Sequence, residues 1–136
     1  MNKAPFQLFR LRKGNEIVGF MRYLKPSKIY FSKDKLWWNG ESIDYREKDS
    51  YIEFDDINKQ WIFESDIVEF KEIQDKHSFF KAVILFDPEE TDFVAINCDT
   101  FQKIKLDFWP KYKMKIVSYL FINPQLAGKL FERGFL

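Results

Sequence analysis

The chain has 136 residues and a formal net charge of +1, with 22 basic and 21 acidic side chains. No apolar stretch approaches the ~20 residues that cross a bilayer, and the first residues hold no apolar signal core, so we expect no membrane segment. The one cysteine, Cys98, excludes an internal disulfide and fits a reducing cytoplasm, which is the expected location.

Strands are expected over most of the chain. Aromatic residues make up 19% of it, and large rings favour β structure. Residues 6–12 and 16–24 flank the turn Lys13-Gly14-Asn15 and predict a hairpin. Further strands are predicted at residues 28–31, 36–38, 51–54, 66–73, 79–86, 92–97 and 114–122. Residues 100–110 are ambiguous, although their apolar residues fit a strand that ends at Trp109-Pro110. The polar and acidic residues 41–50 predict a loop.

A helix is predicted at the C-terminus. Asn123 is a good residue for the N-cap, and Pro124 suits the first helical position, where its missing N–H costs nothing. Apolar residues then recur at helical spacing, at Leu126, Ala127, Leu130 and Phe131. Residues 124–132 are therefore predicted to be a helix, weakened slightly by Gly128.

These elements predict an α+β fold that is mostly β. We expect a single domain, residues 1–136, with a smaller N-terminal β lobe at residues 1–60. Residues 61–136 are expected to form an antiparallel curved sheet or small barrel with a short terminal helix packed against it. The entry Asp66-Ile67-Val68 into that sheet is similar to SH3-like barrels, a likeness of fold alone.

Three segments, residues 51–68, residues 116–126 and Val18-Gly19-Phe20, resemble the YopX-like protein family, small products of prophages, phages and related mobile elements. Residues 51–68 are similar to the family signature Tyr-Thr-Gly-Leu-x-Asp-x-Asn-Gly-x-x-Ile-Tyr-Glu-Gly-Asp-Ile-Val. Residues 116–126 are similar to the family ending Val-Ile-Gly-Asn-Ile-Tyr-Glu-Asn-Pro-Glu-Leu, and Val18-Gly19-Phe20 lies where the family often has Gly-Tyr. The resemblance covers residues 5–130 and implies a β-rich fold and a mobile-element origin, with no accepted activity.

The chain departs from the signature at its glycines. Glu53, Lys59 and Ser65 stand where the family has glycine, the residue that adopts positive φ at little cost, and Ser118 replaces a further glycine. Either the turns differ here or the strain is tolerated. Asn58 is an alternative holder of the left-handed position, because asparagine tolerates that region.

No catalytic apparatus is expected. His77, the only histidine, excludes a multi-histidine metal site within one chain and is expected on the surface. Cys98 is expected to be a packed or idle thiol and not a nucleophile. Six acids before and within the predicted sheet are candidates for a hydrolase pair or a Mg²⁺ site: Asp55, Asp56, Glu64, Asp66, Glu69 and Glu72. A structural role is favoured, in which Asp66 accepts backbone N–H bonds at its turn. We expect no enzyme, cofactor or metal.

The best candidates for binding interleave cations with rings. They are Arg22, Lys25, Lys28, Tyr30, Lys33, Lys35, Trp37 and Trp38, the composition of a surface for single-stranded nucleic acid. Packing in the core or between copies is the alternative, since alternation puts Trp37 and Trp38 on opposite faces. The cluster at residues 111–115 has the same two interpretations, protective lysines on a strand edge or a nucleic-acid surface.

Charge is unevenly distributed along the chain. Residues 1–35, 36–100 and 101–136 carry +7, −11 and +5. Either basic and acidic strands satisfy each other within one molecule, or a bipolar surface joins copies or meets an acidic partner. The leading hypothesis is a non-enzymatic phage or prophage accessory protein that binds a host or phage protein and forms a homo-oligomer. The runner-up is a nucleic-acid-binding module that uses the N-terminal third, and an unrecognised carboxylate-dependent hydrolase is a third.

Overall fold

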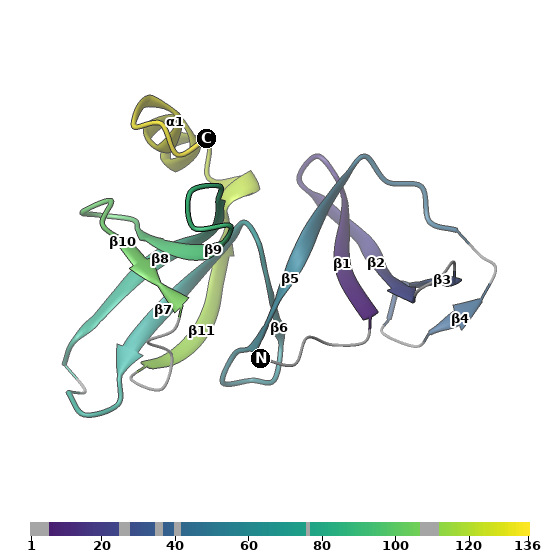
Figure 1. Cartoon of the computed structure of the whole chain (residues 1–136), viewed down its shortest axis with the longest axis horizontal. Helices are drawn as coiled ribbons and strands as arrows, with labels where there is room; N and C mark the ends of the chain where they lie inside the picture. The colour runs from purple at the N-terminus through teal and green to yellow at the C-terminus, as the bar shows by residue number, and fades with distance from the viewer. Residues whose placement is uncertain (1–5, 25–27, 35–36, 40–41, 76, 107–111) are drawn as a thin grey trace. The chain divides into compact units, whose positions relative to one another are not determined.

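The computed structural model describes residues 6–24, 28–34, 37–39, 42–75, 77–106 and 112–136, with only the backbone of Phe6, Trp38 and Asn39. The protein is mostly β with one short C-terminal helix, as the sequence predicted (Figure 1). The strands are β1 (Phe6–Lys13), β2 (Glu16–Leu24), β3 (Lys28–Ser32), β4 (Trp38–Asn39), β5 (Glu47–Asp55), β6 (Trp61–Phe63), β7 (Asp66–Glu72), β8 (Phe79–Asp87), β9 (Asp92–Asn97), β10 (Lys103–Lys105) and β11 (Tyr112–Tyr119). A 3-10 turn, η2 (Leu120–Ile122), and α1 (Pro124–Glu132) follow.

The chain divides into two compact units, Met1–Glu53 and Phe54–Leu136, whereas the sequence placed the boundary at residue 60. The first unit is an antiparallel sheet with the order β4-β3-β2-β1-β5. β5 runs across the boundary into the second unit, where β6 follows it in the strand order. The predicted hairpin at residues 6–24 is confirmed as β1 and β2, joined through Gly14 at φ 60°.

Gly19 is required by the packing of the first sheet. Its φ is 156°, and a Cβ built there would lie 2.6 Å from Ile43 Cδ1 and 2.7 Å from the carbonyl oxygen of Ser32. Real Cβ contacts do not approach so closely, so β2 and β3 pair in this register only because position 19 has no side chain.

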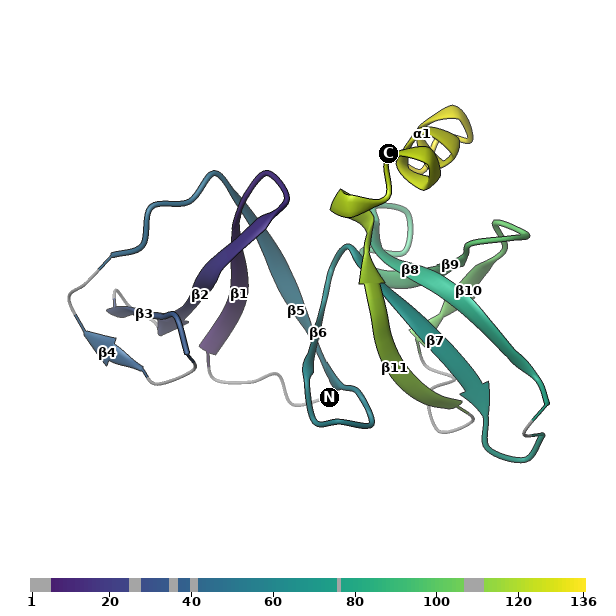
Figure 2. The same ribbon diagram turned by 180° about the vertical axis from the view of Figure 1, so that it is seen from behind.

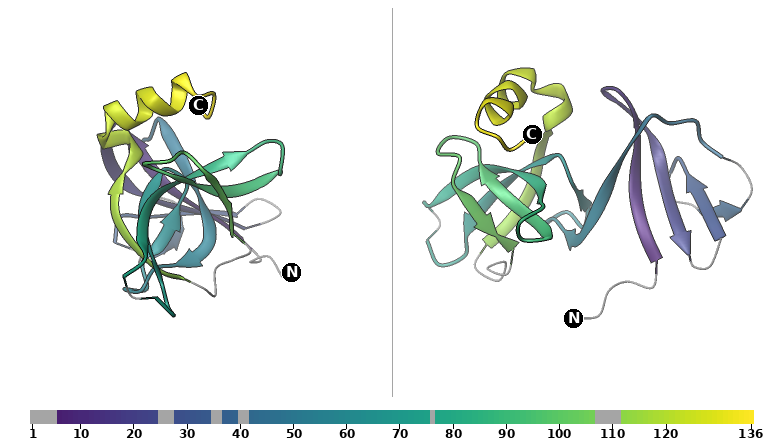
Figure 3. Two further views of the ribbon diagram at one scale, coloured as in Figure 1. Left: turned by 90° about the vertical axis from the view of Figure 1, so that its left-hand side faces the viewer. Right: turned by 45° about the horizontal axis from the view of Figure 1, so that its top comes forward.

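The second unit is an open antiparallel sheet of five strands, β10-β9-β8-β7-β11. Of the two forms expected, the described strands therefore make the sheet and not a closed barrel. One face holds an apolar core into which Leu120 and Leu130 pack, and α1 lies at one end of the sheet (Figure 3). The sheet residues of this core are Ile67, Val83, Leu85, Val94 and Ile96. Leu126 and Ala127 pack against the same cluster, so the apolar spacing that predicted the helix also faces its core.

Several predicted strand boundaries differ from the structure, and two of them have a clear physical reason. The loop expected at residues 41–50 ends early, because β5 begins at Glu47 and pairs with β1 through Arg10↔Asp49. The last strand, expected to reach residue 122, ends at Tyr119, and Leu120–Ile122 form a 3-10 turn. In both places the sequence pattern was misleading: a polar strand has no apolar alternation, and an apolar run has no feature that separates strand from turn.

The helix prediction is confirmed at Pro124–Glu132, but its start differs in chemistry. Asn123 occupies the N-cap position without a side-chain cap bond. Its Nδ2 instead donates to Ser118 Oγ at 2.9 Å and to the carbonyl oxygen of Tyr119 at 2.6 Å. Asn123 thus ties the helix start back to the end of β11.

The three signature positions where this chain lacks glycine all have left-handed backbone. The φ angles of Glu53, Lys59 and Ser65 are 67°, 61° and 75°. Strain is therefore tolerated and the turns keep the geometry that glycine would take. Asn58 does not hold the left-handed position in place of its neighbour, because Lys59 itself does.

Candidate binding surfaces

Three of the residues expected to form a binding surface meet in the first unit. Arg22 on β2 lies directly opposite Tyr30 on β3. The guanidinium carbon of Arg22 is 5.5 Å from the centre of the Tyr30 ring and 4.7 Å from that of the Trp37 ring. All three side chains are half-buried. The cation and both rings thus contact one another, as in an internal cation–π cluster.

The other expected residues divide into two groups. Lys28 and Lys33 are exposed. Lys25 and Lys35 lie outside the described residues, and the structure describes only the backbone of Trp38, which lies in β4.

A buried ion pair holds β1 to β5. Arg10 and Asp49 are each 3% exposed, and Arg10 Nη2 lies 2.8 Å from Asp49 Oδ2. Arg12 reaches the same carboxylate, with Nε 2.8 Å from Oδ2 and Nη2 donating to Oδ1 at 3.0 Å. Burial this deep requires that the charges be compensated. Asp49 therefore provides the negative charge between two arginines and has a clear structural role.

Two of the six candidate carboxylates, Asp56 and Asp66, accept backbone N–H groups. Asp66 is fully buried and its Oδ2 accepts the Phe63 N–H at 2.8 Å, the role predicted for it. Asp56 Oδ1 accepts the N–H groups of Asn58 and Gln60 at 2.8 and 2.9 Å, and its Oδ2 accepts that of Ile116 on β11 at 3.1 Å. Across the described ranges, no three His, Cys, Asp or Glu side chains gather where they could hold a metal ion.

The histidine and the cysteine lie apart in the sequence and differ in burial. His77 is exposed in the β7–β8 connection. Cys98 is partly buried against the core of the second unit. Burial raises the pKa of its thiol to about 11, so the nucleophilic thiolate is scarce at neutral pH.

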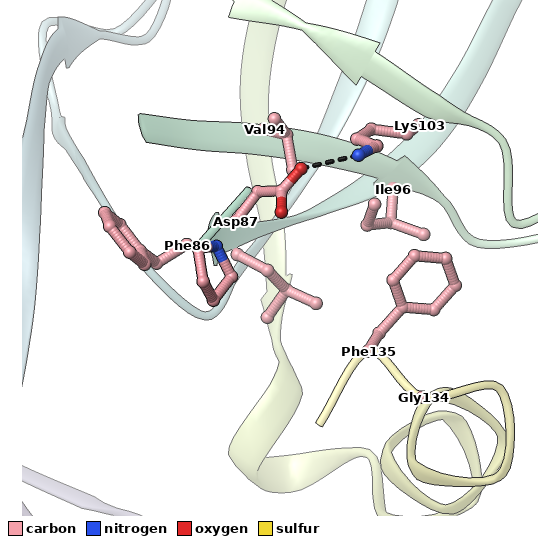
Figure 4. A pocket seen from close by; sticks show the side chains of 9 residues that line it. Phe86, Asp87, Val94, Ile96, Lys103, Gly134 and Phe135 are labelled. Carbon is pink, nitrogen blue, oxygen red and sulfur yellow. Dashed lines mark hydrogen bonds and ion pairs between the residues drawn. The ribbon is translucent and has the colours of Figure 1, made fainter. Parts of the chain in front are cut away.

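A small pocket lies between the second sheet and the residues that follow α1 (Figure 4). Its volume is about 80 Å³, far below the several hundred Å³ typical of ligand sites. Phe135 and Ile96 supply apolar walls, and Asp87 Oδ2 lies 2.5 Å from Lys103 Nζ at its edge. The hydrogen bond from Lys103 lowers the pKa of Asp87 below its usual range. The pocket suits the end of one side chain better than a metabolite.

A second cationic surface lies on the second sheet. The sequence analysis did not predict that lysines from three strands come together there. The register aligns Lys113 with Lys71 and Lys71 with Phe79 in one row, all exposed. The next row is Lys115, Glu69 and Lys81. Residues opposite each other or two apart share a face, so the six residues form one surface, named here the lysine face. Figure 2 shows the strand ends that carry it, at the end of the sheet away from α1.

Exposed apolar side chains gather in the C-terminal segment. Phe131 on α1 is 71% exposed, more than any other large apolar side chain among the described residues. Ile122 and Leu136 are 50% and 51% exposed. Leu126, Ala127 and Leu130 point into the core, so Phe131 extends from the flank of a helix whose apolar stripe is already used.

No family model, curated protein or solved structure matches this chain. Within the described residues, no helix has the length and apolar character needed to span a bilayer.

Proposed function

We propose that this chain is a non-enzymatic accessory protein of a phage, prophage or related element, which acts in the cytoplasm by binding another protein. The origin rests on the resemblance to the YopX-like family. That resemblance is supported by the left-handed backbone at Glu53, Lys59 and Ser65, the signature positions that are glycine in the family. The proposal includes a finer fold assignment. The chain would have a YopX-like fold, and its second sheet would resemble an SH3-like barrel that is open between β10 and β11.

The proposal of a protein partner rests on the exposure of Phe131. Aromatic side chains act as anchors at the centres of protein interfaces, where they fill a pocket on the partner. A phenylalanine that is 71% exposed gains little from its own fold and has most of its surface left to bury. Ile122 and Leu136 lie in the same C-terminal segment and add exposed apolar area.

The test is capture of partners from host lysate with the tagged chain, a Phe131→Ser variant and a Phe79→Ser control. Phe79 is a matched control because it is 62% exposed but lies on the β8 strand. We expect the parent and the control to retain one protein stoichiometrically after nuclease treatment, and Phe131→Ser to lose it. Equal capture by Phe131→Ser, or capture that nuclease abolishes, would contradict the proposal.

Self-association is the second part of the proposal. β10 and β11 are edge strands of the second sheet, and edges are covered when a second copy pairs with them. Light scattering at micromolar concentration and ~0.15 M salt should give a mass above 16.5 kDa. A monomer mass under these conditions would refute self-association.

Nucleic-acid binding by the N-terminal third is the second candidate function. Of the cations expected to bind there, the structure describes Arg22, Lys28 and Lys33, and among these Lys28 and Lys33 are exposed. The Arg22 guanidinium is already covered by the Tyr30 and Trp37 rings, which leaves less of the cluster available to a base or phosphate. Substitution of Lys28 and Lys33 therefore tests this candidate.

A further inference from the structure

The lysine face presents four cations and one acid on one surface of the second sheet. Lys71, Lys81, Lys113 and Lys115 are exposed, and Glu69 lies between Lys115 and Lys81. No ion pair joins any of the four lysines to a carboxylate among the described residues. Their charges are therefore left to solvent.

One pairing on this face costs stability. Lys113 lies directly opposite Lys71 on the neighbouring strand. Opposite residues on an antiparallel pair have Cβ atoms about 5 Å apart, and like charges there are destabilising. An anion bound between the two ammonium groups would remove that repulsion.

The other face of the same strands is filled with rings. Phe70 stacks on Phe80 with ring centres 5.2 Å apart, and Tyr112 packs edge-on against both. Phe70 is only 2% exposed. The strands beneath the lysines are thus held by packing that the lysine side chains do not share, so the lysines can be changed without loss of the fold.

We propose that the lysine face binds single-stranded nucleic acid. Two rows of lysines, about 7 Å apart along the strands, offer a cationic track for a phosphate backbone. Phe79, 62% exposed in the first row, supplies a ring on which a base stacks. Cations beside an exposed ring on an open sheet are the elements that single-strand binders combine. This proposal does not rest on the protein partner above, because it uses another surface.

A single strand suits the face better than an acidic protein. An acidic partner would pair with the lysines but would leave the Phe79 ring without a specific role. A base has a flat face that matches an exposed ring whatever its sequence. Salt dependence and the ring contribution therefore separate the two occupants.

The experiment measures fluorescence anisotropy of a labelled oligothymidylate of about 15 nucleotides with the full chain. Lys71→Gln with Lys113→Gln removes two phosphate contacts. The salt slope should then flatten by about 1.4, and affinity at ~0.1 M salt should fall about 25-fold. Lys81→Gln with Lys115→Gln is a second pair from the other row and should lose a similar amount. Replacing Lys71 and Lys113 with Arg should keep the affinity.

Phe79→Ala separates stacking from charge. It should weaken binding about 5- to 150-fold, the range for loss of one stacked base, and leave the salt slope unchanged. Lys48→Gln with Lys129→Gln is the matched charge control, because both lysines are exposed and lie outside the lysine face, and it should leave affinity nearly unchanged. Circular dichroism of every variant checks that the strands remain.

Four results would overturn the assignment. They are no binding by the parent at ~0.05 M salt, an equal loss in the Lys48 and Lys129 control, an unchanged affinity in Phe79→Ala, and displacement by polyglutamate as effective per charge as by unlabelled oligothymidylate. The last result would indicate a general anion surface that an acidic protein occupies equally well.

Discussion

Asp49→Asn should be one of the most damaging single changes in the first unit. Asparagine is close to aspartate in size but uncharged, so the Arg10 and Arg12 guanidiniums would keep their charge and lose the negative charge of Asp49. Arg10 and Asp49 have side chains only 3% and 4% exposed, so water cannot replace the lost charge. Removing one partner of such a buried pair costs about 3–5 kcal/mol. That is a large share of the 5–15 kcal/mol that stabilises a typical domain.

Asp44→Asn is the control, because the two pairs have the same distance and differ in burial. Asp44 Oδ2 lies 2.8 Å from Lys13 Nζ, as Asp49 Oδ2 lies 2.8 Å from Arg10 Nη2. The Lys13 and Asp44 side chains are 41% and 87% exposed, so solvent screens their attraction. The same substitution there should leave the free energy of unfolding within experimental error.

Urea unfolding followed by circular dichroism measures both. With a slope of about 2 kcal/mol per molar urea, Asp49→Asn should lower the midpoint by about 2 M. Pairing Asp49→Leu with Arg10→Met removes two buried charges together and should recover much of the loss. Equal midpoints for Asp49→Asn and Asp44→Asn would refute the reasoning that burial, and not the short distance, decides the energy.

Three further changes test the turns, the helix and the thiol. Lys59→Gly should raise the free energy of unfolding by about 0.5–1 kcal/mol in the same urea assay, since glycine takes φ 61° without strain, while Asn58→Gly should give no such gain. Gly128→Ala should also stabilise by about 0.5–1 kcal/mol, because a Cβ at this helical position meets nothing within 4 Å. Alkylation of Cys98 by iodoacetamide at pH 8 can be followed by mass spectrometry, and it should be about a hundredfold slower in the folded chain than in urea. Burial raises the pKa of the Cys98 thiol from 9.0 to about 11, so the reactive thiolate is scarcer in the folded chain. Equal alkylation rates would contradict that burial.

The elements that the sequence predicted well are those whose signals are local. The closing helix follows from Asn123-Pro124 and the spacing after it, and the β1–β2 hairpin follows from alternation around Gly14. β5 was missed at its start because its buried residue there is Asp49. What makes an aspartate acceptable inside a sheet is Arg10, which lies 39 positions away and carries no local signal.

The candidate surfaces needed long-range information of the same kind. The sequence placed Arg22 among cations and rings, but only the β2–β3 register and the position of Trp37 show that its guanidinium is covered. The lysine face combines residues from β7, β8 and β11. Alternation in each strand indicates which lysines share a face, and a correct pairing of β7 with β8 would have joined Lys71 to Phe79. The pairing with β11 cannot be deduced from neighbouring residues.

Ion pairs within one chain reduce the charge that is available to hold two copies of the chain together. The basic first and last parts of the sequence were expected to pair with the acidic middle, in one molecule or between molecules. The pairs of Arg10 and Arg12 with Asp49, of Lys13 with Asp44, of Lys103 with Asp87 and of Lys105 with Glu90 each join an outer part of the sequence to the middle part within one chain. Part of the +7, −11 and +5 pattern is therefore compensated inside the fold.

Association of copies should then depend on apolar area more than on charge. Raising the salt from ~0.15 M to ~1 M shortens the Debye length from about 8 to 3 Å and would weaken a charge-driven assembly. We expect the mass from light scattering to stay the same over this range. Binding of oligothymidylate should disappear over the same range, because the lysine face acts through its charge. An assembly that dissociates in salt while oligothymidylate stays bound would reverse both assignments.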